Sequence, residues 1–254
     1  MTKAAEYRAQ LRALNYWDPY LLRESGLPGP RGNIELAQVV ADEGDLQLFQ
    51  RYIAFTPNEA PTNSPYEFLA FCGIVGLGRL LAEGDLSLFD SLRRYASDSR
   101  WRIREAVAMA LQRLGETDME RLLAEMQNWS HGTPLEQRAA AAGLCEPRLL
   151  GQAKHAREVQ QLSDGITAVI ERADNRGSQE FKVLRKGLGF CWSVAVAALP
   201  AEGKAILEKW LASPNKDVQW IVKENLKKAR LRRMDADWVQ EWLNRTSKWS
   251  VGSE

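Results

Sequence analysis

Residues 97–115 read SDSRWRIREAVAMALQRLG, and the spacing of their apolar side chains predicts the fold class. Its apolar residues recur every three or four positions, the spacing of one buried face on an α-helix, and a glycine closes it. These residues are Trp101, Ile103, Val107, Ala110, Leu111 and Leu114. Residues 217–226, DVQWIVKENL, repeat 98–107, DSRWRIREAV, with Asp first, Trp fourth, Ile or Val sixth, a basic residue seventh and Glu eighth. The recurrence predicts that one structural unit occurs more than once.

Shorter repeated segments precede the helical stretches. GDLQLF at 44–49 returns as GDLSLF at 84–89, and TDMERL follows at 117–122. Each of these segments begins with Gly or Thr followed by Asp, and such a start suits the N-terminus of a helix. Pro134 is likewise expected in the first turn of a helix over 134–144. Because no stretch shows β-branched alternation bounded by turns, we expect an all-α chain of two-helix units.

We expect a single repeat domain over residues 1–254 with helical caps at both ends. The N-terminal cap and its loop take 3–33, and a terminal cap helix takes 235–249. About five repeats lie between them, at 34–83, 84–115, 117–150, 161–199 and 203–231. The first repeat is expected to open with one helix over 34–55, and the last to close with one over 217–231. Stacked units of this kind form an α-solenoid.

The pattern of the opening stretch resembles the second helix of a HEAT repeat. The residues that carry the resemblance are Asp98, Ile103, Arg104, Glu105, Val107, Ala110, Leu111 and Leu114. Asp217, Val222, Lys223 and Leu226 are similar to the same frame, although Arg230 stands in the place of Leu111. In that family the Asp and the Arg form ladders between neighbouring repeats. The resemblance covers most of the chain and implies the HEAT-like α-solenoid, an architecture that serves many functions.

The recurring charged residues have a structural and a chemical interpretation. Asp98 and Asp217 are expected to cap helices, a role worth about 1 kcal/mol each, rather than to act as catalytic carboxylates. Arg104 and Lys223 are expected to pair with an Asp of a neighbouring unit, and phosphate binding is the alternative. The glycines of KGLGF, 186–190, are expected to allow close contact between helices.

Charge is distributed unevenly along the chain, although its net value is +1. Residues 33–90 hold nine acidic and two basic residues, and 204–233 hold nine basic and three acidic ones, which predicts an acidic end and a basic end. Six of the nine tryptophans lie in the last 63 residues. Basic residues among aromatic ones are typical of nucleic-acid surfaces, whereas tryptophans also fill gaps between helices.

Several classes of function lack their sequence signatures. Three cysteines and two histidines are scattered without the spacing of a metal site or a disulfide framework, and Cys191 is expected to be a buried thiol. Phosphate-binding loops and nucleophile elbows are missing. The longest uncharged apolar run, 68–78, is shorter than the roughly 20 residues of a membrane span, and no secretory signal opens the chain. We expect no metal, no cofactor, no membrane contact and a cytoplasmic location.

Two hypotheses for function follow. The first is a scaffold without enzyme activity that binds a macromolecular partner, expected to be a protein, on the concave face of the solenoid. The second is nucleic-acid binding through the basic segment 182–233. Trp101 with Arg104 and Trp220 with Lys223 loosely resemble elements of the HEAT-like alkylpurine DNA glycosylases. That resemblance implies a basic concave face with tryptophans and, if the chain is an enzyme, glycosylase-like activity; no motif identifies a catalytic residue.

The candidate binding residues combine the repeated tryptophans with basic residues of the same helices. They are Trp101, Arg104, Trp220, Lys223, Lys186 and Lys227. If they line one positive channel, duplex binding is expected to be tight at low salt and to weaken steeply as salt rises.

Overall fold

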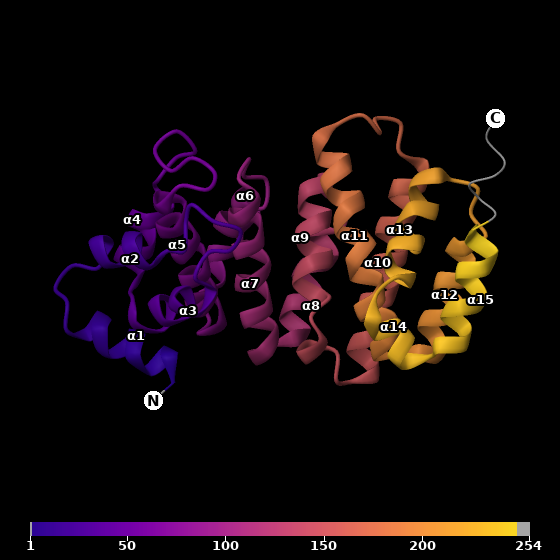
Figure 1. Cartoon of the computed structure of the whole chain (residues 1–254), viewed down its shortest axis with the longest axis horizontal. Coiled ribbons are helices and arrows are strands. Elements are labelled where there is room, and N and C mark those ends of the chain that lie inside the picture. Colours follow the sequence, from indigo (N-terminus) through magenta and orange to yellow (C-terminus); the bar gives the residue numbers. More distant parts are fainter. Residues whose placement is uncertain (1, 248–254) are drawn as a thin grey trace. The chain divides into compact units, whose positions relative to one another are not determined.

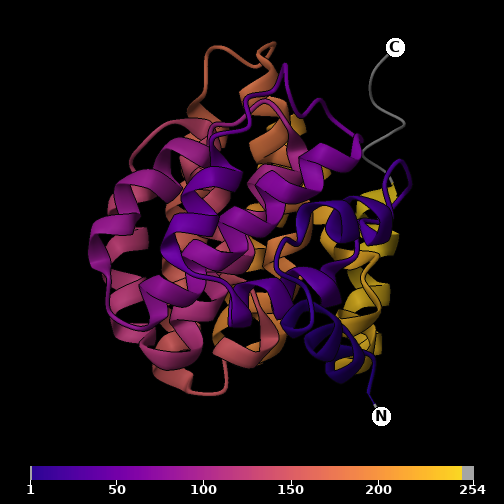
Figure 2. The same cartoon turned by 90° about the vertical axis from the view of Figure 1, so that its left-hand side faces the viewer.

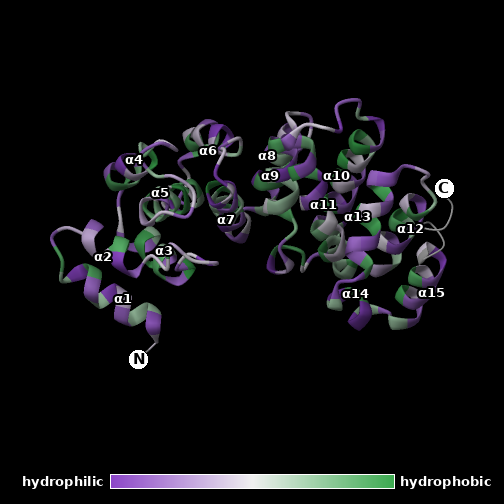
Figure 3. Cartoon of the chain, turned by 45° about the horizontal axis from the view of Figure 1, so that its top comes forward, coloured by the Kyte–Doolittle hydropathy of each residue, from purple (hydrophilic) through white to green (hydrophobic). Residues whose placement is uncertain are grey.

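The computed structural model describes residues 2–247, which form α-helices and two short 3-10 turns (Figure 1). No residue in that range belongs to a β-strand, so the all-α prediction is confirmed. The end of the predicted cap, including Trp249, lies outside the described residues. The chain divides into two compact units, Met1–Asp118 and Met119–Glu254, which are described separately. Hydrophobic and hydrophilic residues alternate along their helices, as amphipathic helices require (Figure 3).

The first unit is arranged around one central helix. Its helices are α1 (Lys3–Arg12), α2 (Asp18–Glu24), α3 (Ile34–Glu43), α4 (Leu46–Ile53), α5 (Pro65–Ala82), α6 (Phe89–Tyr95) and α7 (Trp101–Thr117). The central helix α5 packs against α3, α4 and α7 (Figure 2). Ser64 starts α5 by accepting the Glu67 N–H, and Pro65 occupies the first turn, where its missing N–H costs nothing.

Helix α5 is apolar on all sides because it is buried on all sides. By length and composition it could cross a membrane, but 72% of the relevant stretch is buried inside the protein, as in the core of a soluble fold. A Cβ on Gly78 would lie 2.4 Å from the Cα of Ala110 on α7. Glycine at this position therefore lets the two helix backbones approach closely.

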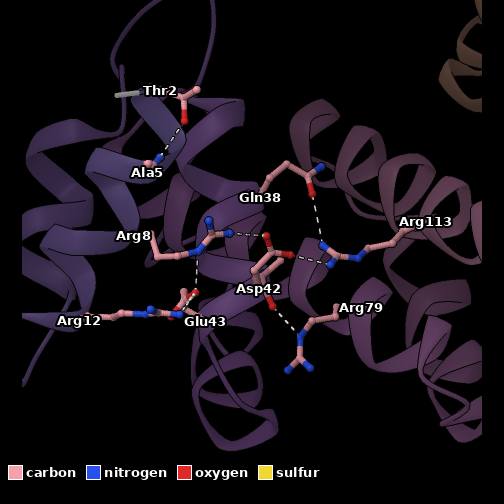
Figure 4. A network of polar contacts seen from close by, with 10 residues as sticks. Thr2, Ala5, Arg8, Arg12, Gln38, Asp42, Glu43, Arg79 and Arg113 are labelled. Carbon is pink, nitrogen blue, oxygen red and sulfur yellow. Dashed lines mark hydrogen bonds and ion pairs between the residues drawn. The ribbon is translucent and has the colours of Figure 1, made fainter.

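Ion pairs tie α1, α3 and α7 together in the first unit. Asp42 on α3 lies between Arg8 of α1, at 3.2 Å, and Arg113 of α7, at 2.6 Å (Figure 4). The neighbouring Glu43 accepts from Arg8 and Arg12. Arginines from outside residues 33–90 thus neutralise part of the acidic segment, so the charge count along the sequence overstates how acidic this end is.

The second unit contains three helical pairs in two layers. Its helices are α8 (Met119–Trp129), α9 (Pro134–Leu144), α10 (Ala153–Arg172), α11 (Gln179–Ala198), α12 (Pro200–Leu211), α13 (Lys216–Leu226), α14 (Ala229–Met234) and α15 (Ala236–Ser247). One layer places α11 between α9 and α13, and the other places α10 between α8 and α12. Thr133 and Glu136 form a capping box at the start of α9, with Pro134 in the first turn as expected.

Two helices predicted as continuous are interrupted. The one expected over 34–55 divides into α3 and α4 because Asp45 accepts the Leu48 N–H and starts a new helix. The one expected over 217–231 ends at Leu226, and α14 begins at Ala229. Both predictions followed apolar spacing, which continues across a short break when the next helix buries a similar face.

Candidate functional site

The two aspartates of the repeated stretches do not cap their helices. Asp98 accepts hydrogen bonds from the backbone N–H and from Nε and Nη2 of Arg100. The remaining guanidinium nitrogen, Nη1, donates to the carbonyl groups of Phe55 and Ala60. Arg100, not Asp98, occupies the N-cap position of α7. At α13 the capping oxygen belongs to Asn215. The capping prediction was wrong because the two helices do not start where the sequence pattern indicated. Helix α7 has its N-cap two residues after Asp98, and α13 has its N-cap two residues before Asp217.

Asp217 instead binds two arginines. Arg176 donates to one carboxylate oxygen at 2.8 Å, and Nε of Arg185 lies 2.8 Å from the other without hydrogen-bond geometry. The Arg185 guanidinium also lies over the Trp220 ring, 4.0 Å from its centroid. A basic residue of α11, Arg185, therefore pairs with the Asp of α13. With two cations on it, Asp217 is not available as a free carboxylate for catalysis.

The predicted binding residues occupy different environments. Trp101 and Arg104 lie on α7 of the first unit, where Arg104 donates to the carbonyl groups of Asp98 and Ser99 and thereby holds the start of its own helix. In the second unit, Lys186 lies on α11, Trp220 and Lys223 lie on the neighbouring helix α13, and Lys227 directly follows α13. Lys186 is exposed, Lys223 is half-buried, and Lys227 pairs with Glu224. Trp220 is half-buried beneath Arg185, so its ring offers little surface for stacking.

An exposed basic and aromatic surface emerges beside these residues. Lys182, Lys186 and Phe190 recur every four positions on α11 and form one exposed stripe, in which the Phe190 side chain is 48% exposed. The cations of Lys228 and Arg230 lie 5.4 and 5.2 Å from the centroid of the Phe190 ring. None of the four cations forms an ion pair with another described residue. We call Lys182, Lys186, Phe190, Lys228 and Arg230 the basic–aromatic surface.

Sequence reasoning missed Phe190, although its spacing from Lys182 and Lys186 was a usable signal. The predicted basic segment 182–233 also included Lys204 and Lys209. Both lie on α12, in the other layer, where Lys204 pairs with Asp235 and Lys209 with Asp164.

Four tryptophans of the second unit belong to the core. Trp129, Trp192, Trp210 and Trp238 are buried, and each donates its indole N–H to a side-chain oxygen. The acceptor of Trp192, for example, is the hydroxyl of Thr167 at 2.9 Å. Burial with a satisfied N–H is the usual state of core tryptophan, so these rings fill the space between helices, as the structural interpretation predicted.

Gly189 brings α11 and α13 into close contact, in agreement with the prediction for KGLGF. A Cβ at this position would lie 2.9 Å from the nearest carbon atom of the Trp220 ring and 3.4 Å from Cβ of Glu224. Glycine therefore lets the ring settle on the backbone of α11, with Arg185 over it.

Replacing Gly189 by alanine is expected to lower the free energy of unfolding by about 1–3 kcal/mol, because the added methyl group displaces the packed ring of Trp220. Urea titration followed by circular dichroism measures this loss. Gly165→Ala on α10 is the matched control, since nothing lies within 4 Å of a Cβ there, and it is expected to stabilise the helix by roughly 0.5–1 kcal/mol. Equal effects of the two substitutions would contradict the close contact.

The remaining candidates for chemistry are not reactive groups. Cys145 and Cys191 are buried, and the neighbouring Cys191 thiol together with burial raises the pKa of Cys145 well above its usual range. Residues 2–247 contain no cluster of three His, Cys, Asp or Glu side chains that could hold a metal ion. Comparison with protein-family models, with curated proteins and with solved structures finds no match to this chain.

Proposed function

We propose that the chain is a binding protein built from the HEAT-like repeats of an α-solenoid, and that its second unit binds single-stranded nucleic acid. Three observations support the repeat architecture: the recurring sequence pattern, the helical pairs in two layers, and the Arg185–Asp217 pair between successive helices of one layer. The ligand is proposed from the basic–aromatic surface alone.

The exposed ring of Phe190 is the main observation in support of a nucleic-acid ligand. An exposed phenylalanine flanked by lysine and arginine offers a flat face on which a base can stack, while the cations neutralise the neighbouring phosphates. Stacking on an aromatic side chain is sequence-tolerant and contributes about 1–3 kcal/mol per base. We favour a single strand over a duplex because bases stack on a protein ring only when they are unpaired.

The cations of this surface are available to a ligand. Lys182, Lys186, Lys228 and Arg230 have no acidic partner among residues 2–247, in contrast to Lys204 and Lys209 on α12. A phosphate backbone can therefore approach the four cations of the basic–aromatic surface without breaking an existing ion pair. The expected ligand on this unit is thus a nucleic acid rather than the protein partner favoured by sequence reasoning.

Phe190→Ala is expected to weaken binding of a fluorescein-labelled 12-nucleotide single strand by roughly 5- to 100-fold in fluorescence anisotropy at low salt, because one stacking contact is lost. Lys186→Gln is expected to weaken binding less and to make it less salt-dependent. Both side chains are exposed, so both variants are expected to keep the wild-type melting temperature.

Lys209→Gln provides the control, because it removes an equal charge from the other layer and is expected to leave the affinity unchanged. A Phe190→Ala variant that binds the strand as tightly as the wild type would refute stacking. Displacement of the strand by poly-glutamate at equal charge concentration would show instead that the surface attracts any acidic polymer, including an acidic protein segment.

A further inference from the structure

A cavity of about 370 Å³ lies beside Trp101 in the first unit. Leu27, Ile34, Phe68 and Trp101 contribute apolar surface, and Arg31, Arg102 and Glu105 also line it. The volume falls at the lower end of the range for cavities that bind small molecules, which are mostly apolar with a few polar groups. The structure therefore contains a concave site that neither the repeat architecture nor the basic–aromatic surface requires.

The wall of this cavity is held in place before any ligand binds. The segment before α3 forms one side, and Nη2 of Arg102 donates to its Gly29 carbonyl group at 2.7 Å. The Gly29 N–H in turn donates to Oδ1 of Asn63 at 3.0 Å. Since both bonds connect this segment to other elements of the first unit, the cavity is largely preformed.

Two apolar side chains at the cavity are unusually exposed. The Trp101 side chain is 45% exposed and that of Ile34 is 51% exposed, whereas most large apolar residues of this unit are buried. A planar apolar group inserted beside them would remove this surface from water, which is favourable by roughly 25 cal/mol for each Å². Aromatic rings also gain from stacking against one another.

Two arginines line the cavity, and one of them has no acidic partner among the described residues. Arg31 is exposed and forms no ion pair within the described part of the chain. Arg102 is only 6% exposed, its guanidinium lies 4.4 Å from the centroid of the Trp101 ring, and its Nε has no hydrogen-bond partner in the structure. A carboxylate is the ligand group that pairs most strongly with an exposed guanidinium such as that of Arg31, because the two can form two parallel charge-assisted hydrogen bonds.

We propose that this cavity binds a small aromatic carboxylic acid. The ring of the ligand packs against Trp101, Ile34 and Phe68, and its carboxylate accepts hydrogen bonds from the exposed guanidinium of Arg31. The site is separate from the nucleic-acid surface, which lies on the other unit.

The test uses the full chain and 1-anilinonaphthalene-8-sulfonate, an aromatic monoanion whose fluorescence rises in apolar sites. Saturable binding at one site per chain is expected, with displacement by indole-3-acetate at least ten times more effective than by the neutral indole-3-ethanol. Trp101→Ala and Arg31→Gln are each expected to weaken binding at least fivefold. Both side chains are at the surface, so both variants should fold, which their melting temperatures verify.

Phe190→Ala is the matched control, because it removes an exposed aromatic ring that also lies beside cations but belongs to the second unit. It is expected to leave binding of the dye unchanged. Loss of dye binding in Phe190→Ala alone, or equal displacement by the acid and the alcohol, would overturn the proposal. Binding that survives both Trp101→Ala and Arg31→Gln would overturn it as well.

Discussion

Replacing Glu67 by glutamine is expected to lower the free energy of unfolding by about 3–5 kcal/mol, because it leaves a buried guanidinium without its counter-charge. Glu67 is fully buried at the start of α5, and Arg102 on α7 is nearly so. One oxygen atom of Glu67 accepts from the Asn63 N–H at 2.7 Å and from Nη1 of Arg102 at 3.2 Å. Removing one partner of a buried ion pair lowers the free energy of unfolding by more than the intact pair adds to it, because the remaining charge stays buried without a counter-charge.

Urea unfolding of Glu67→Gln measures this loss, and Glu83→Gln is the matched control. Glu83 pairs with Arg79 one helical turn away on the exposed end of α5, where solvent screens the interaction, so its loss is expected to be several times smaller. The double variant Glu67→Leu, Arg102→Met is expected to regain most of the stability, because it removes both buried charges. A Glu67→Gln variant as stable as Glu83→Gln would show that this pair is not buried.

Replacing Asn225 by leucine is expected to cost about 2–5 kcal/mol, because the Asn225 side chain satisfies backbone groups inside the second unit. It is fully buried on α13. Its oxygen atom accepts the Ser193 N–H of α11 at 2.7 Å. Its nitrogen atom donates to the carbonyl groups of Leu188 and Ile221, both at 2.8 Å. Leucine has a similar volume but leaves these groups without the partner that Asn225 provides.

Asn128→Leu on α8 makes the same chemical change at an exposed position and is expected to have little effect on urea unfolding. Because Asn225 fixes α13 against α11, its loss should also shift Lys228 and Arg230 away from Phe190 and reduce binding of the single strand. Equal stability of the two leucine variants would disprove the role of Asn225 in joining these helices.

Local signals in the sequence predicted the helices well. Periodic apolar residues identified α7 and α13, Pro134 marked the start of α9, and the glycines of KGLGF indicated a close contact that Gly189 makes. The break between α3 and α4 was missed because a single capping residue, Asp45, decides it against a continuing apolar pattern.

The candidate site was harder to predict because exposure depends on distant parts of the chain. Trp220 appeared suited to stacking, but Arg185, 35 positions earlier, covers its ring. Phe190 was not singled out in the sequence, yet it is exposed on the stripe of α11 that also carries Lys182 and Lys186. Its four-residue spacing from these lysines indicates a shared helix face, but not whether that face is exposed.

The salt dependence of single-strand binding is the decisive measurement for the basic–aromatic surface. If the four cations around Phe190 contact phosphates, the logarithm of the association constant should fall with the logarithm of salt concentration with a slope of about −3, since each contact contributes roughly −0.7. Removing Lys182, Lys186, Lys228 and Arg230 together should bring the slope close to zero. A wild-type slope near zero, or one unchanged in the fourfold variant, would contradict nucleic-acid binding at this surface.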